Sequence, residues 1–218
     1  MTKEMIFKSV IEDLDKLKSR STPSIRAIGK SYFKEVDRLS LDEVIILSRS
    51  LLDLNTFASK TIAFQFLLKK KKAYQSKYFD HFEQIAFDYL NDWWDTDDFT
   101  THALGEMIDQ YPYLSYLLNR WTTHERFAVR RAAATALILP IKRRNQNIMS
   151  PFEISDRLMH DPHYLVTKGY GWMLKVYMAY EKEKVITYLK TYEDSMPRLA
   201  FRYAIEKLTP LDKKKYFK

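Results

Sequence analysis

Apolar residues recur every three or four positions along almost the whole chain, and this spacing predicts amphipathic helices. In the first such segment Met5, Ile6, Val10 and Leu14 fall on one side of a helix. We find no convincing strand, so the pattern predicts an all-α chain. The expected helices are Lys3–Lys18, one opening at Thr22-Pro23, one following Ser40, Asn55–Leu68, Tyr74–Leu90, Trp94–Gln110, one between Pro112 and Trp121, Glu125–Leu139, Pro151–Met159, His163–Tyr180, Lys184–Tyr192 and Pro197–Leu208.

Polar residues and prolines mark several of the expected helix ends. Ser40 and Glu43 have the spacing of a capping box. Thr22-Pro23 combines a natural capping residue with a proline at the first helical position. Pro140 is expected to stop the alanine-rich helix, because proline cannot donate the hydrogen bond of a helix interior. The most loop-like segment is 142–150, and the remaining turns are short.

Three of these helices carry unusual polar or aromatic residues, near Asp98, Arg131 and Trp172, at spacings of 33 and 41 residues. Helical repeats of the HEAT class have a similar period, and their stacking forms a concave surface lined by equivalent helices. We therefore predict an α-solenoid of HEAT-like repeats, although an irregular helical domain would give a similar pattern. The single domain covers residues 1–218, with an N-terminal helix in 1–20, a repeat array in 21–208 and a basic tail in 209–218.

The composition narrows the class of protein. The 218 residues carry a net charge of +8, with 4 glycines and no cysteine. So few glycines argue against nucleotide-binding loops and sheet folds, and the lack of cysteine excludes disulfides and thiolate sites. No apolar run reaches the length of a membrane span and no signal peptide is evident, so we expect a cytoplasmic protein. The positive charge would attract a phosphate backbone, and the concave face is expected to be basic.

The first candidate motif places two adjacent tryptophans among four acids. Trp94 and Asp98 are four residues apart and share one face of a helix. Asp92, Asp95 and Asp97 are interpreted as acids at a helix start, where capping and the helix dipole stabilise them. Asp98 lies too far into the helix for capping, so it is the candidate functional carboxylate.

The second motif is Arg130-Arg131, followed by three alanines. Small residues let helices pack closely and leave an arginine standing clear, free to make bidentate contacts with a phosphate. The alternative is a surface arginine, or one that pairs with a carboxylate.

The third motif places Gly169 and Gly171 in one predicted helix beside Trp172. Each glycine costs about 1 kcal/mol relative to alanine in a helix, so a bare backbone is needed there. Close packing of helices would explain it, and so would the close approach of a ligand. Trp172 itself is a candidate either for the core or for a site.

Together these three motifs resemble the AlkD-type bacterial DNA alkylation repair proteins, which are DNA glycosylases built from HEAT-like helical repeats. The resemblance follows the same order, at similar spacing, from about Pro23 to Leu208. The double-tryptophan acid motif is fairly specific, and the other two count in combination with it.

The resemblance implies a site and an activity. By motif, the family's aspartate is Asp98, its two tryptophans are Trp94 and Trp172, and its DNA-contacting arginine is Arg131, with Arg130 as the alternative register. The implied reaction is excision of positively charged N3- or N7-alkylated purines from double-stranded DNA, without a metal or other cofactor. The implied protein is a monomer with no obligate protein partner and no membrane contact, and it associates with the bacterial nucleoid when bound.

The residues fit this chemistry without the family name. A cationic alkylated purine is a good leaving group, so positive charge develops on the sugar, as in glycoside hydrolysis. A fixed carboxylate would stabilise that charge and orient water. Tryptophan faces attract cations and would flank the sugar.

Two departures from the family keep other functions open. Ala128 occupies the region where the family usually has an aromatic, and one helix is predicted before Thr22 where active members typically have two. A non-catalytic DNA-binding relative is therefore one alternative, and a protein-interaction scaffold is another. A metal-dependent hydrolase would need Asp95 with Asp98, or His160 with His163, as ligands.

Overall fold

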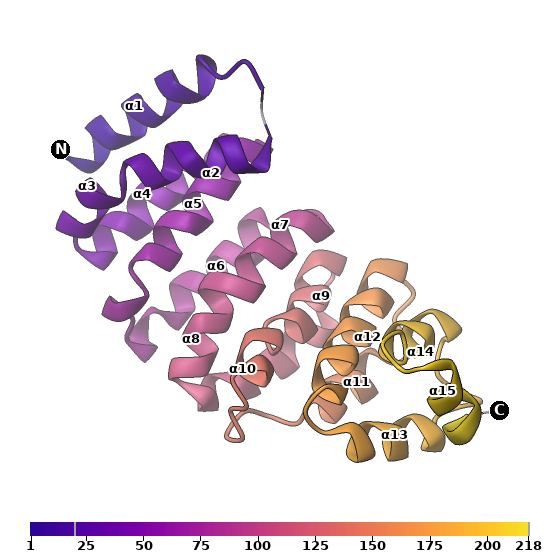
Figure 1. The fold of residues 1–218 in the computed structure, drawn as a ribbon. Helices are drawn as coiled ribbons and strands as arrows, with labels where there is room; N and C mark the ends of the chain where they lie inside the picture. The colour runs from indigo at the N-terminus through magenta and orange to yellow at the C-terminus, as the bar shows by residue number, and fades with distance from the viewer. Residues whose placement is uncertain (20, 218) are drawn as a thin grey trace.

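The structure, a computed structural model, describes residues 1–19 and 21–217. Within these residues it is all-helical and contains no strand, as the sequence predicts. The helices stack from α1 at one end to α15 at the other, so the two termini lie far apart (Figure 1). Residues 20 and 218, which close the predicted N-terminal segment and the basic tail, lie outside the described residues.

The α-helices are α1 (Lys3–Asp15), α2 (Thr22–Ser31), α3 (Phe33–Arg38), α4 (Leu41–Asp53), α5 (Phe57–Lys69), α6 (Phe79–Tyr89), α7 (Trp93–Asp98), α8 (Gly105–Gln110), α9 (Phe127–Thr135), α10 (Ile138–Lys142), α11 (Pro151–Leu158), α12 (Tyr164–Met178), α13 (Lys182–Thr191), α14 (Arg198–Ala204) and α15 (Pro210–Tyr216). Three segments are 3₁₀-helical: η1 (Lys71–Ala73), η2 (Ser76–Tyr78) and η4 (Pro112–Thr123). The segment η3 (Phe99–Leu104) is a π-helix between α7 and α8.

Local capping explains where many helices begin. The capping box before α4 is confirmed, because the Ser40 hydroxyl accepts from the Glu43 amide and the Glu43 carboxylate accepts from the Ser40 amide. At α2 the capping residue is Ser21, one position earlier than expected, and Pro23 occupies the first turn. Side chains that satisfy free amides at helix starts fix these boundaries.

One expectation about a helix end is wrong. Pro140 does not stop the alanine-rich helix, because α9 already ends at Thr135 and Pro140 lies in the first turn of α10. A proline is tolerated in a first turn, where its missing N–H has no helical acceptor. The expected basic tail contains the short helix α15, and the ring of Phe217, which follows this helix, packs 5.1 Å from that of Phe201.

The sequence separation of hydrogen-bonded side chains reflects the repeat architecture. Most side-chain hydrogen bonds between separate helices of the described chain join positions 29 to 39 apart, whereas the bond from Arg26 to Asp98 spans 72. The bond from Tyr78 to Asp42 spans 36 residues and that from Arg143 to Asp109 spans 34. Such a regular separation is expected when each repeat contacts its neighbours in a stack.

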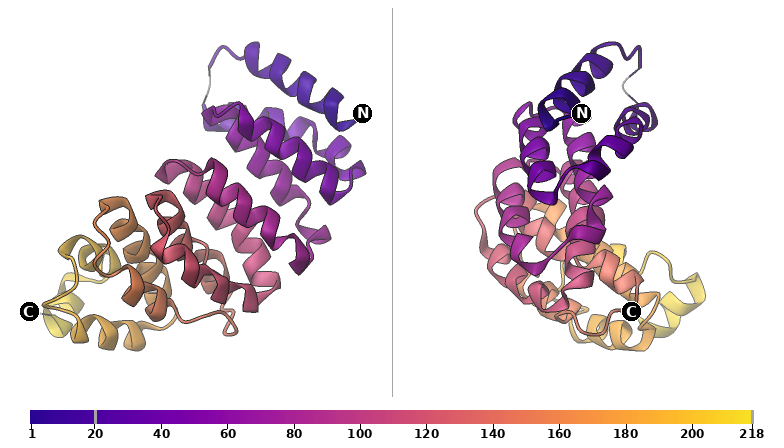
Figure 2. Two further views of the ribbon diagram at one scale, coloured as in Figure 1. Left: turned by 180° about the vertical axis from the view of Figure 1, so that it is seen from behind. Right: turned by 90° about the vertical axis from the view of Figure 1, so that its left-hand side faces the viewer.

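One layer of the stack forms the concave face. Helices α2, α5, α7, α9, α12 and α14 pack each against the next. The stack is curved, and the view along its edge shows the arch (Figure 2, right). The concave side faces the viewer in Figure 1.

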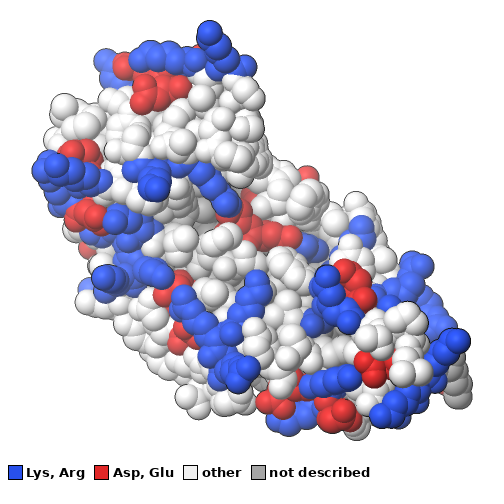
Figure 3. Space-filling view, in the orientation of Figure 1, with Lys and Arg blue, Asp and Glu red and all other residues white. Residues whose placement is uncertain are grey.

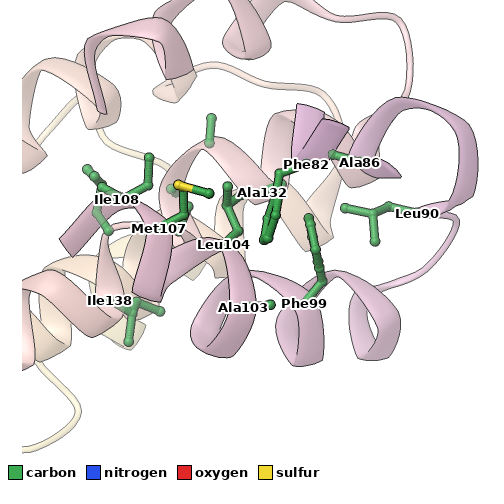
Figure 4. Close-up of a cluster of buried hydrophobic side chains, with 14 of the residues drawn as sticks. Phe82, Ala86, Leu90, Phe99, Ala103, Leu104, Met107, Ile108, Ala132 and Ile138 are labelled. Carbon is green, nitrogen blue, oxygen red and sulfur yellow. The ribbon is translucent and has the colours of Figure 1, made fainter. Parts of the chain in front are cut away.

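A continuous apolar core runs between the layers. At its centre Phe82 of α6, Phe99 of η3, Met107 of α8 and Ala132 of α9 are fully buried against one another (Figure 4). Burying apolar surface contributes about 25 cal/mol per Å², so this shared core holds consecutive repeats together. None of the described helices has the length and apolar character that a membrane crossing requires.

Candidate functional site

The concave face carries both signs of charge. Acidic side chains gather at its centre over α7, and Lys and Arg side chains lie on both sides of them (Figure 3). The basic character expected for this face is therefore found at its flanks, around an acidic centre.

The start of α7 is held firmly by two of the four acids. Asp92 caps the helix, accepting from the amide of Trp93, and Asp95 closes a capping box by accepting from the amide of Asp92. The Asp95 carboxylate also pairs with Lys60 of α5 at 2.8 Å, and both side chains are buried. The expectation of structural roles for Asp92 and Asp95 is confirmed.

A pocket of about 470 Å³ opens on the concave face next to α7. Four successive inner helices, α7, α9, α12 and α14, contribute to its wall. Its lining residues are Trp93, Asp97, Arg131, Tyr164, Leu165, Lys168, Trp172, Lys175 and Tyr203.

An ion pair fixes the carboxylate of this pocket. Arg131 donates from Nε and from Nη2 to the two oxygens of Asp97, each at 2.8 Å, and from Nη1 to the carbonyl of Leu165. The Arg131 side chain is 6% exposed, whereas that of Asp97 is 18% exposed. Burial raises the pKa of Asp97 above its ordinary value, and the hydrogen bonds and charge of Arg131 oppose this shift. The Asp97 carboxylate is therefore held in one orientation and is partly desolvated.

Two tryptophans line the same pocket. Trp93 is 50% exposed, and Trp172 is half-buried. The glycines beside Trp172 allow α12 to lie close to both neighbouring helices. A Cβ at position 169 would lie 3.1 Å from Cγ of Arg131, and one at 171 would lie 2.9 Å from the carbonyl oxygen of Ala200. The glycines therefore serve close helix packing, which brings Trp172 to the pocket.

Comparison with known proteins now gives the family. The sequence model described as "DNA alkylation repair enzyme" matches residues 4–208. The chain belongs to the DNA alkylation repair enzyme family.

The fold comparison agrees with this family. A predicted DNA alkylation repair enzyme from Enterococcus faecalis has a similar solved structure, with a TM-score of 0.72 at 15% identity, covering 87% of each chain. No curated protein sequence matches significantly. Membership of the DNA alkylation repair family supports a role in DNA repair, with DNA as the partner.

The pocket of this family member does not contain all four residues that the sequence motifs suggested. Arg131 and Trp172 lie in it, but Trp94 and Asp98 do not. The Trp94 ring instead packs 4.9 Å from that of Phe57 on the side of α5, with Lys60 over it. These four side chains therefore do not line a single pocket.

The Asp98 side chain points from α7 towards the N-terminal part of the stack. Its Oδ1 pairs with Arg26 of α2 at 2.8 Å and lies 3.4 Å from Nδ1 of His102. It lines a separate pocket of about 240 Å³, whose floor includes Phe33 and Phe64. Burial raises the pKa of Asp98, and the charges of Arg26 and His102 oppose the rise.

The two arginines also differ from expectation. Arg131 does not stand clear for a phosphate, because its side chain is buried and donates to Asp97 and Leu165. Arg130 lies outside the pocket. It pairs with Asp161 and donates to the carbonyl of His124, so it ties the start of α9 to the segment before α12.

Sequence reasoning did not select Trp93 and Asp97, which line this pocket. The available signal was their spacing, since they are four residues apart, like Trp94 and Asp98. The positions of the side chains do not support a metal-dependent hydrolase. The described residues contain no group of three or more His, Asp or Glu side chains that could share a metal ion. Asp95, one of its expected ligands, is buried against Lys60.

Proposed function

We propose that this chain is a DNA glycosylase that hydrolyses the N-glycosidic bond of positively charged N3- or N7-alkylated purines in duplex DNA. The observation that supports it most is a carboxylate, Asp97, fixed by Arg131 in a pocket that also contains Trp93 and Trp172. Family membership makes alkylated DNA the expected substrate.

The leaving group needs little help from the protein. An alkylated purine that carries a positive charge departs as a neutral base, taking the electron pair of the C1′–N bond. Positive charge then develops on the deoxyribose, as in glycoside hydrolysis. Asp97 stabilises this charge, and a preorganised carboxylate does so best in a partly desolvated pocket. Water adds to C1′, and its proton passes to Asp97 or to solvent.

The aromatic residues complete the site for a sugar cation. Trp93 and Trp172 come from two different repeats and line one pocket. The face of an indole ring attracts a cation, so both rings favour the charged sugar over the neutral one. Interactions that strengthen in the transition state are the ones that accelerate a reaction.

Arg131 is a positioning residue in this proposal. Its two parallel hydrogen bonds hold the Asp97 carboxylate in one orientation, which is the strength of a bidentate arginine pair. An ionised carboxylate has about four acceptor positions, so two remain for the sugar and the water. Because three of its five N–H donors are used within the protein and its side chain is 6% exposed, Arg131 is not the phosphate contact in this scheme.

The test compares two neighbouring aspartates on one helix. Asp97→Asn should slow the release of N7-methylguanine from methylated duplex DNA by about 100- to 1,000-fold, the usual effect of removing one electrostatic group. Asp98→Asn, the matched control, should stay within a few-fold of the wild-type rate. The measurement is single-turnover base release, with DNA binding followed in parallel.

Each other outcome has a definite meaning. A large loss with Asp98→Asn and none with Asp97→Asn would restore Asp98 as the functional carboxylate. DNA binding by the wild type without any base release would refute the glycosylase and leave a non-catalytic DNA-binding relative.

A further inference from the structure

The charges of the pocket do not balance. Asp97 is paired with Arg131 through both oxygens, and Lys175 lies 2.9 Å from the carboxylate of Glu206. Lys168 also lines the pocket, but it forms no ion pair with any carboxylate in 1–19 and 21–217. The excess positive charge of the pocket is therefore that of Lys168.

Two tyrosine rings hold the Lys168 ammonium in place. Its Nζ lies 5.1 Å from the ring centre of Tyr164, one turn earlier on α12, and 6.0 Å from that of Tyr203 on α14. A tyrosine face attracts an ammonium group but carries no formal charge. The contacts thus orient the amine without neutralising it, and its hydrogen-bond donors stay available to an anion.

The position of Lys168 matches the need of a bound nucleotide. It lies one helical turn before Trp172, and both side chains line the pocket. A deoxyribose between the two tryptophans would bring its flanking phosphates to the edge of the same pocket. Arg131 is poorly placed to meet them, because three of its five N–H groups are bonded to Asp97 and Leu165 and its side chain is 6% exposed.

We propose that Lys168 is the phosphate-binding residue of this site. It neutralises the backbone phosphate next to the nucleotide in the pocket and so fixes the register of the strand. Which nucleotide is held there rests on the proposed function, whereas the phosphate contact itself requires only DNA.

The salt dependence of binding to undamaged duplex DNA tests this directly. Each phosphate neutralised contributes about 0.9 to the slope of log K against log salt concentration. Lys168→Gln should reduce that slope by about 0.9 and weaken binding roughly 5- to 10-fold near 0.1 M salt. Lys168→Arg should restore the wild-type slope, because it restores the charge.

Lys190→Gln is the matched control. Its Nζ also lies over a tyrosine ring, 5.4 Å from the centre of Tyr216, but on α13 and outside the pocket. It should keep the wild-type slope. Equal slopes for Lys168→Gln and Lys190→Gln would overturn the proposal, and so would a loss of affinity in Lys168→Gln without a change of slope.

The proposed glycosylase can fail separately. Absence of base release by the wild type would end the assignment of the activity, but the slopes measured on undamaged DNA would still decide the role of Lys168. Base release with unchanged slopes would keep the activity and remove Lys168 from the phosphate contact. Wild-type protein that shows no salt-dependent binding of DNA would end both.

Discussion

At the scale of single residues, Asp97 combines a strong partner with an unfavourable environment. Burial raises its pKa, although Arg131 holds both of its oxygens. In such a partly dry position a negative charge acts more strongly on a nearby cation than it does in water. Under the proposed function, the same desolvation that disfavours the carboxylate would make it effective towards a cationic sugar.

The pH profile of base release should carry this signature. A raised pKa means that Asp97 takes up a proton at a higher pH than a free aspartate, whose ordinary value is 3.8. The rate should fall on acidification with a midpoint above that value, because protonated Asp97 has no charge to offer. Arg131→Gln should move the midpoint to still higher pH, since it removes the cation that favours ionisation. Single-turnover rates, corrected for spontaneous depurination, measure both; a midpoint shifted to lower pH in Arg131→Gln would contradict this view.

The residue scale also shows what the sequence could specify. The motifs predicted a site on α7 with Arg131 and Trp172 beside it, and both of these residues line the pocket next to that helix. Trp93 and Asp97 line this pocket in place of Trp94 and Asp98, and the sequence could not separate the two pairs because both have the same spacing. Successive residues on a helix point about 100° apart, so the two pairs face different neighbours. Which pair faces the pocket depends on the packing of α7 between α5 and α9, and spacing alone does not contain that information.

At the scale of elements, helix starts were easier to predict than helix interiors. The Ser40–Glu43 capping box is a local interaction, and it was found from four residues. The 3₁₀ segment η4 and the π-helix η3 were both expected as ordinary helix. These geometries reflect packing against other repeats, so short-range signals do not reveal them.

The pair Lys60–Asp95 shows how strongly two elements can depend on one contact. Lys60→Met should lower the free energy of unfolding by about 3–5 kcal/mol, because it leaves the buried Asp95 carboxylate without its cation. Lys72→Met, at an exposed position of η1, is the control and should change it by less than about 0.5 kcal/mol. Denaturant unfolding measures both. Equal stability of the two variants would show that the amides of Asn91 and Asp92 suffice for Asp95.

At the scale of the whole molecule, each repeat bonds chiefly to its neighbours in the stack. The bond between Arg26 and Asp98 is longer in range, because it spans 72 residues, about twice the usual separation. This pair joins α2 to α7 across α5 on the concave side. In a solenoid each repeat usually contacts only the next one, so this contact couples two repeats that are not neighbours in the stack.

Breaking that contact should loosen one end of the solenoid and leave the other unchanged. In Arg26→Gln the amides of α2 should exchange hydrogen up to about five-fold faster, because a partly exposed pair contributes at most about 1 kcal/mol. Amides of α12 should exchange at the wild-type rate. Hydrogen-exchange mass spectrometry measures both. Asp98→Asn should have the same effect on α2, and the double variant should add nothing; additive effects would mean that the two residues do not act as a pair.

The π-helix η3 has a consequence for how relatives are compared. Its hydrogen bonds close over one residue more than those of an α-helix, so a relative without it would need one residue fewer between α7 and α8. An ungapped alignment anchored on the core of α8 would then displace the tryptophans and aspartates of α7 by one position. Reliable transfer of roles between such relatives requires the gap to be placed between Phe99 and Leu104.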